Sequence, residues 1–87
     1  MNFSKLLFGD KYIFTDNALE RMKKLEISRG TIKNILNSYD RSEKADNGMK
    51  FYAKFYGRTE RGVLAKKDAP DGKTYVIQVW ERQLYKA

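Results

Sequence analysis

Apolar residues in the first half of the chain recur with the spacing of α-helices. Two groups of four each fall on one helical face, at i, i+1, i+4 and i+7 and at i, i+3, i+4 and i+7. The groups are Ala18, Leu19, Met22 and Leu25, and then Ile32, Ile35, Leu36 and Tyr39. The connection around Ile27 is short, which favours helices that lie next to each other. The pattern therefore predicts an N-terminal helical hairpin.

The flanking residues agree with this prediction. Thr15 or Asp16 can cap the first helix, and Ser28 can accept the exposed backbone N–H groups at the start of the second. Ahead of the helices, residues 11–14 have the composition of a short strand, and residues 1–10 are a candidate apolar arm.

After Asp40 the pattern changes from helical spacing to strands separated by turns. Asn47-Gly48 is a turn signal, and residues 50–56, 61–67 and 73–82 are three candidate strands joined by turns at 57–60 and 68–72. The sequence predicts an α+β fold in which the helical hairpin packs on a three- to four-stranded antiparallel sheet. The opposite face of the sheet is then open for a ligand.

The strand at residues 50–56 alternates two kinds of side chain. Period-2 geometry places Phe51, Ala53 and Phe55 on one face, which we expect to be core. The other face carries Lys50, Tyr52, Lys54 and Tyr56. Ammonium groups beside phenol rings suit phosphates and unpaired bases, so we expect this face to bind nucleic acid. The alternative is an exposed strand that uses lysine for solubility and tyrosine for β propensity.

The last strand and the neighbouring turn continue the basic pattern. If Tyr75, Ile77 and Val79 face the core, Trp80 and Arg82 emerge together on the ligand face. Four further cations lie on the adjacent hairpin and could clamp phosphates or remain solvated on the surface. They are Arg58, Arg61, Lys66 and Lys67.

Composition limits the chemistry. The 87 residues include no cysteine and no histidine, which excludes disulfides, thiolate nucleophiles and every mechanism that uses an imidazole. Lys and Arg number 18 against 11 Asp and Glu, a net charge of +7, so the expected partner is a polyanion, first of all nucleic acid. We expect a single domain over residues 1–87 that uses no metal and no cofactor. No apolar run approaches the 18 residues needed to cross a bilayer, so we expect no membrane partner and a cytoplasmic location.

The segment Phe14-Thr15-Asp16-Asn17-Ala18-Leu19-Glu20-Arg21-Met22 resembles a family of small domains with a His-Ala-x-x-Arg-Met motif, related to the RelE/ParE-like toxins. The strand that begins Arg61-Gly62-Val63-Leu64 and the ending Val79-Trp80-Glu81-Arg82-Gln83-Leu84-Tyr85 are similar to the basic strand and Arg-x-x-Tyr ending of RelE-type proteins. The chain departs from the motif at Asn17, which stands in place of its histidine. An amide cannot transfer a proton, and its alternative role is to cap the helix.

The resemblance implies a RelE-like domain that cleaves RNA without a metal, often on the ribosome. Arg61 and Arg82 would then neutralise the phosphate, Tyr85 would orient a base, and Lys54 or Lys66 would act as acid or base. The expected partners are RNA or a ribonucleoprotein, together with an acidic protein antitoxin or a host protein target.

Three functions follow from these observations, and the third is a protein-binding module with Phe3, Leu6 and Leu7 as its anchor. The first is a RelE-like toxin acting on mRNA or the ribosome as a metal-independent endoribonuclease. The second is a noncatalytic RNA- or nucleoprotein-binding regulator or inhibitor, of the kind found in phages and mobile elements. The absence of histidine weakens the first without excluding it, so the sequence leaves catalysis open.

Overall fold

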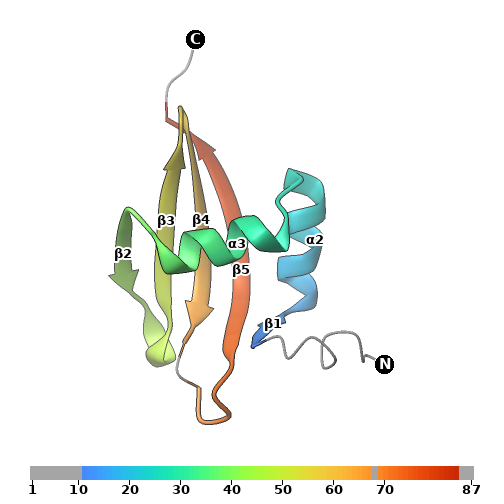
Figure 1. Ribbon diagram of the computed structural model, residues 1–87, viewed down its shortest axis with the longest axis vertical. Coiled ribbons are helices and arrows are strands. Elements are labelled where there is room, and N and C mark those ends of the chain that lie inside the picture. The colour runs from blue at the N-terminus through green and yellow to red at the C-terminus, as the bar shows by residue number, and fades with distance from the viewer. Residues whose placement is uncertain (1–10, 68, 85–87) are drawn as a thin grey trace.

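The core of the fold is one five-stranded mixed sheet. The computed structural model describes residues 11–67 and 69–84. Its strands are β1 (Tyr12–Phe14), β2 (Arg41–Lys44), β3 (Lys50–Tyr56), β4 (Thr59–Lys66) and β5 (Thr74–Gln83). They lie in the order β1-β5-β4-β3-β2 (Figure 1). The α+β class and the three strands expected in the second half are confirmed.

The sheet differs from the prediction in size and direction. We predicted three or four antiparallel strands, whereas β1 pairs in parallel with β5 and β2 adds an antiparallel edge next to β3. All four residues of β2 are exposed. The strand therefore has no hydrophobic alternation by which the sequence could reveal it. A short 3-10 turn, η1 (Asp46–Gly48), connects β2 to β3 and contains the predicted Asn47-Gly48 turn.

Two short helices, α2 (Asp16–Leu25) and α3 (Arg29–Asn37), begin at hydroxyl caps. The Oγ1 of Thr15 accepts from the Ala18 N–H at 3.0 Å, and the Oγ of Ser28 accepts from the Thr31 N–H at 3.1 Å. Helix α2 ends where Glu26 adopts a left-handed conformation with φ of 57°. Asn17 is an exposed residue within α2, so the expectation that it caps the helix is wrong.

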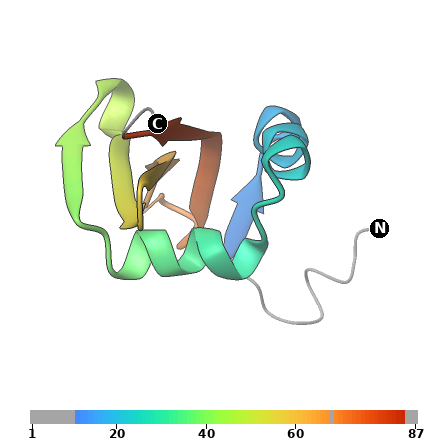
Figure 2. The ribbon, with the colours of Figure 1, turned by 90° about the horizontal axis from the view of Figure 1, so that it is seen from above.

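The helices do not form the predicted N-terminal hairpin. They follow the short strand expected near residues 11–14, which is β1, but each meets the sheet differently: α3 crosses β3, β4 and β5, while α2 stands beside β5 near β1 (Figure 1). Viewed from above, α3 runs along one face of the sheet (Figure 2). Their apolar residues join one cluster with the sheet. It contains Ala18, Met22, Ile27, Ile32, Ile35, Leu36, Tyr52, Val63, Ala65, Val76 and Val79.

An irregularity in β5 decides which of its residues enter this core. The register shifts between Leu64, which pairs with Gln78, and Ala65, which pairs with Val76, so Ile77 is the extra residue. Val76 and Val79 are therefore both buried, although simple alternation would place them on opposite faces. Beyond the bulge, Trp80 and Arg82 lie on the face opposite the helices, as predicted, but the expected core row was wrong before it, because Val76 is buried rather than Tyr75 or Ile77.

Two further predictions concern residues 1–10 and the membrane. The candidate apolar arm at residues 1–10 lies outside the described residues. Within residues 11–67 and 69–84, no helix has the length and apolar character required to cross a bilayer.

Candidate functional site

The face of the sheet opposite α3 carries a pocket. It has a volume of about 310 Å³ and no residue of α2 or α3 lines it. Its walls come from three strands. They are Arg41, Ser42 and Glu43 of β2, Phe51 and Ala53 of β3, and Trp80 and Arg82 of β5. We call this surface the open face.

A tryptophan covers the centre of the open face. Gly62 pairs with Trp80 across β4 and β5, and the indole ring lies directly over the glycine. A Cβ built on Gly62 would lie 2.0 Å from Cζ2 of Trp80, a distance at which atoms overlap. The glycine therefore lets the ring approach the backbone, and the ring remains half-buried, with part of its surface facing solvent.

A buried carboxylate lies between two arginines beside this ring. The side chain of Glu60 in β4 is 0% exposed. Its Oε2 accepts from Arg41 Nε at 2.9 Å and forms an ion pair with Nη2 of the same residue at 2.8 Å, while its Oε1 accepts from Arg82 Nη2 at 2.5 Å. Both oxygens are thus bonded to guanidinium groups, which is what a buried charge requires.

The two arginines keep part of their binding capacity. The side chains of Arg41 and Arg82 are 43% and 59% exposed. A guanidinium has five N–H donors, and the hydrogen bonds to Glu60 use one on Arg41 and one on Arg82. Glu43 at the rim of the pocket takes one more from Arg41 at 3.4 Å. The arrangement can hold an anion at the edge of an aromatic surface.

The basic face predicted for β3 is inverted. Lys50, Tyr52, Lys54 and Tyr56 lie on the side that the helices cover, and Tyr52 is only 4% exposed. Phe51, Ala53 and Phe55, which we expected in the core, lie on the open face, where Phe55 is 45% exposed. The alternation was right, but the assignment of its two sides was wrong.

Two of the lysines predicted to bind nucleic acid contact the end of α3. Lys54 Nζ donates to the Ser38 carbonyl at 2.9 Å, and Lys67 Nζ donates to the Leu36 carbonyl at 3.0 Å. The last carbonyls of a helix lack helical partners and carry a partial negative charge, so cations stabilise them. Long lysine side chains can therefore border a buried face while their ammonium groups reach a polar partner.

The predicted catalytic residues do not gather at one place. Arg61 pairs with Glu81 at 3.1 Å on the helix-covered side, where its guanidinium also lies 5.1 Å from the ring of Tyr56. Tyr56 accepts a hydrogen bond from Asn34 of α3 at 3.0 Å. Arg82 projects from the opposite face and bonds Glu60. One sheet therefore separates the two arginines that the resemblance assigned to the same phosphate.

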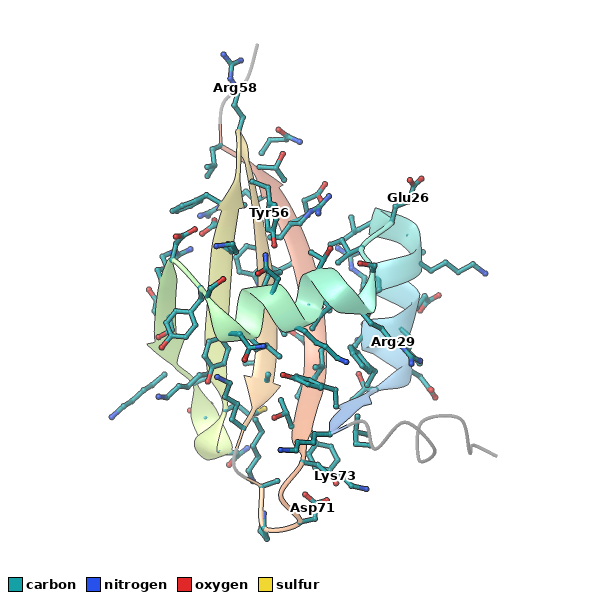
Figure 3. The ribbon with its side chains drawn as sticks, in the orientation of Figure 1. Glu26, Arg29, Tyr56, Arg58, Asp71 and Lys73 are labelled. Atoms are coloured by element: carbon teal, nitrogen blue, oxygen red, sulfur yellow. The ribbon has the colours of Figure 1, made fainter. Side chains whose placement is uncertain are left out.

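The remaining predicted residues lie apart from both arginines. Arg58 stands at the tip of the β3–β4 turn and points away from the sheet (Figure 3). Lys66 reaches toward the η1 turn, since its Cε would lie 3.6 Å from a Cβ built on Gly48. Tyr85 lies outside the described residues.

Sequence reasoning missed Arg41, Glu60 and Phe51. Arg41 belongs to the strand that has no hydrophobic pattern, and Glu60 occupies a position that we assigned to a turn. The sequence contained one signal for Glu60. Glu60 and Gly62 alternate with Arg61 and Val63 as residues of a strand do, and a glycine inside a strand often marks a place where another group approaches the backbone closely.

We searched the described residues for a metal site and compared the chain with known proteins. No group of three or more His, Cys, Asp or Glu side chains suited to a metal occurs in the described part of the chain. Comparison of the chain with protein-family models, with curated proteins and with solved structures finds no match.

Proposed function

We propose that this protein binds single-stranded RNA on the open face of its sheet. The observation that carries the proposal is the juxtaposition of the partly exposed Trp80 ring with Arg41 and Arg82 in one pocket of about 310 Å³. An unpaired base can stack on the indole, and the guanidinium groups can donate to the phosphates on either side. The net charge of +7 supports attraction of a polyanion to the whole molecule.

The leading role in this proposal is noncatalytic. Catalysis of RNA cleavage needs a group that takes the proton of the attacking 2′-hydroxyl and groups that stabilise the phosphate charge. Among the described residues Glu60 is the one buried carboxylate, and both of its oxygens accept from guanidinium groups. Binding without cleavage fits a regulator or inhibitor that acts on RNA or a ribonucleoprotein.

A metal-independent endoribonuclease of the RelE-like toxin kind is the second candidate, and the Arg41–Glu60–Arg82 cluster favours it. An RNA phosphate that draws the two guanidinium groups toward itself would leave Glu60 able to accept a proton. The arginines would then stabilise the charge that develops on the phosphate. In this version Arg82 keeps the role that the sequence suggested, and Glu60 replaces the lysines as the base.

One experiment tests the proposal and separates the two candidates. The protein is incubated in EDTA with a structured and an unstructured RNA, and the samples are analysed for retarded complexes and for cleavage products. We expect retardation of the unstructured RNA with a log–log salt slope of about −0.7 per phosphate contacted. Intact RNA favours the regulator, and products that Glu60→Gln abolishes favour the nuclease.

Two variants locate the binding surface, with a matched control. Trp80→Ala removes one stacking surface and should weaken binding by about 1–3 kcal/mol. Arg82→Gln should reduce the magnitude of the salt slope by about 0.7. Arg21→Gln removes the same charge from the exposed surface of α2 and should leave both quantities unchanged. Equal losses in the Arg82 and Arg21 variants, with folding intact by circular dichroism, would overturn the open-face assignment.

A further inference from the structure

A second pocket lies on the other side of the sheet, next to the end of α3. It has a volume of about 270 Å³ and is lined by Tyr39, Gly48, Lys50, Tyr52 and Lys67. It shares no lining residue with the open face. The helix-covered side of β3 provides Lys50 and Tyr52, whereas Phe51 between them faces the opposite way. We call it the lysine pocket.

One lining residue of this pocket, Lys50, has a second lysine as its partner on the neighbouring strand. Lys50 lies directly across from Lys44 in the β2–β3 pairing, and both residues are exposed. Like charges at directly opposed positions of an antiparallel pair destabilise it. Within the described residues, no carboxylate forms an ion pair with either lysine. The sheet thus holds two adjacent positive charges that a bound anion would neutralise.

Contacts within the protein hold a third lysine at the pocket. Lys67 Nζ donates to the Leu36 carbonyl at 3.0 Å and lies 5.1 Å from the centre of the Tyr52 ring. An ammonium group has three donors, so the bond to Leu36 leaves others for a ligand. An anion at this site must compete with the Leu36 carbonyl for the Lys67 ammonium.

The other walls of the lysine pocket are aromatic rings and a glycine, which can contact the organic group to which a bound anion is attached. Tyr39 and Tyr52 form a tilted ring pair with centroids 5.1 Å apart, and Tyr39 is 45% exposed. Gly48 has a φ of 76° and no side chain, which leaves its backbone accessible at the pocket wall. Lys66 reaches the same glycine from β4. The pocket therefore combines cations with an aromatic side.

We propose that the lysine pocket binds a phosphate group, with Lys44, Lys50 and Lys67 as its cationic contacts. Phosphate is compact and carries up to two negative charges, and lysine binds it as a point charge without a fixed geometry. The carrier of the phosphate is a free phosphomonoester or the terminal phosphate of a nucleic acid. This inference does not depend on RNA binding at the open face.

Inorganic phosphate is the first probe. The amide of Gly48 is followed by NMR while phosphate replaces chloride at constant pH and ionic strength, and the thermal midpoint is measured in the same buffers. We expect a saturable shift of the Gly48 amide and a midpoint that rises with phosphate. A Gly48 shift that is absent, or that chloride reproduces, would overturn the proposal.

Charge-removing variants identify the contacts. Lys50→Gln should weaken phosphate binding about tenfold, the loss of one charge-assisted hydrogen bond. The same variant should raise the thermal midpoint of the unliganded protein, because it relieves the repulsion from Lys44. Lys24→Gln makes the same change of charge on α2 and should leave phosphate binding unchanged. If the two variants weaken binding equally, the effect is a property of net charge and the pocket is refuted.

A second pair of ligands distinguishes the two sources of phosphate. A short oligonucleotide is compared with and without a 5′-phosphate, in the Trp80→Ala variant so that the open face contributes little. If only the phosphorylated form shifts Gly48, the ligand is a nucleic-acid end. If neither form shifts Gly48 while inorganic phosphate does, the ligand is a small phosphomonoester. Loss of RNA binding at the open face would leave both readouts intact.

Discussion

Gly62 is the residue at which one methyl group should have the largest effect on the open face. A Cβ at this position would overlap Cζ2 of Trp80 at 2.0 Å, so Gly62→Ala must displace the ring. We expect a loss of about 2 kcal/mol in the free energy of unfolding, typical of overpacking. Urea denaturation measures the loss, and tryptophan fluorescence should report a ring that is more exposed to water.

Gly30 offers a control for the same substitution. It lies in α3, and the nearest atom to a built Cβ is Ser28 Oγ at 3.7 Å, an ordinary contact. Because alanine favours helix more than glycine does, Gly30→Ala should stabilise the protein by about 0.5 kcal/mol. Equal effects at the two glycines would contradict the packing of Trp80 on Gly62.

Glu60 makes the stability of the molecule depend on Arg41 and Arg82 together. Removal of both guanidinium groups leaves a carboxylate that is 0% exposed without its charged partners. We expect the double variant Arg41→Ala/Arg82→Ala to lose about 3 kcal/mol in chemical denaturation, the lower end of the range for broken buried pairs, because both arginines are partly exposed.

The dependence can be separated from side-chain packing. In a Glu60→Gln background, the same double alanine change no longer leaves a buried charge, so it should cost less than half as much. The difference between the two backgrounds is the coupling energy of a double-mutant cycle. A cost that is the same in both backgrounds would assign the effect to the alkyl parts of the arginines.

At the scale of elements, Thr15 joins a helix to a strand. Its Oγ1 accepts from the Ala18 N–H and donates to the Ile77 carbonyl at 2.8 Å, so one hydroxyl caps α2 and ties it to β5. Thr15→Ala should cost about 1–2 kcal/mol. Asn17→Ala, two residues later on the exposed surface of α2, should change thermal stability little. The reverse order would restore Asn17 as the capping residue.

The turn between β4 and β5 should respond to pH. The Tyr75 hydroxyl and the Lys73 N–H both donate to Asp71, and these bonds hold the pKa of its carboxyl below the ordinary value. A carboxyl with a lowered folded-state pKa stabilises the fold above its unfolded pKa of about 4, and this contribution is lost as the pH falls through the folded-state pKa. Thermal midpoints should therefore decrease less steeply with acid in Asp71→Asn than in the parent.

Tyr75, the hydrogen-bond partner of Asp71, should make stability depend on pH in the alkaline range. The same hydrogen bond raises the pKa of Tyr75, because the neutral phenol is the donor. Its contribution is complete below the unfolded pKa of tyrosine, about 10, and is lost as the pH rises through the higher folded-state value. Tyr75→Phe should remove this alkaline dependence, and spectrophotometric titration of the parent should show one tyrosine that ionises late.

Elements with a periodic pattern could be predicted from the sequence, and those without one could not. The helical faces of Ile32, Ile35 and Leu36 became core, as did Ala18 and Met22. In contrast, β2 is polar along its length, and only its pairing with β3 makes it a strand. We assigned the two sides of β3 the wrong way round because we expected its lysines to face solvent. Lys54 instead lies on the helix-covered side and donates to the carbonyl at the end of α3.

At the scale of the whole molecule, the candidate site depends on the order of the strands. Arg41, Glu60 and Arg82 are separated by 19 and 22 residues, and they meet because β2, β4 and β5 lie in one sheet. The spacing of residues within one strand carries no information about contacts between side chains of different strands. The sequence did place Trp80 beside Arg82, since those two share one strand and one side of it.

The parallel pairing of β1 with β5 has a consequence for the order of events during synthesis. Tyr12 pairs with Thr74, and the backbone bonds from Thr74 to Lys11 and from Thr15 to Val76 close both ends of β1. Contacts between residues so distant in sequence make folding slower. The long loop between them must close, at a cost in conformational entropy, before any contact compensates for that cost. In a nascent chain, β1 therefore has no partner until β5 has left the ribosome.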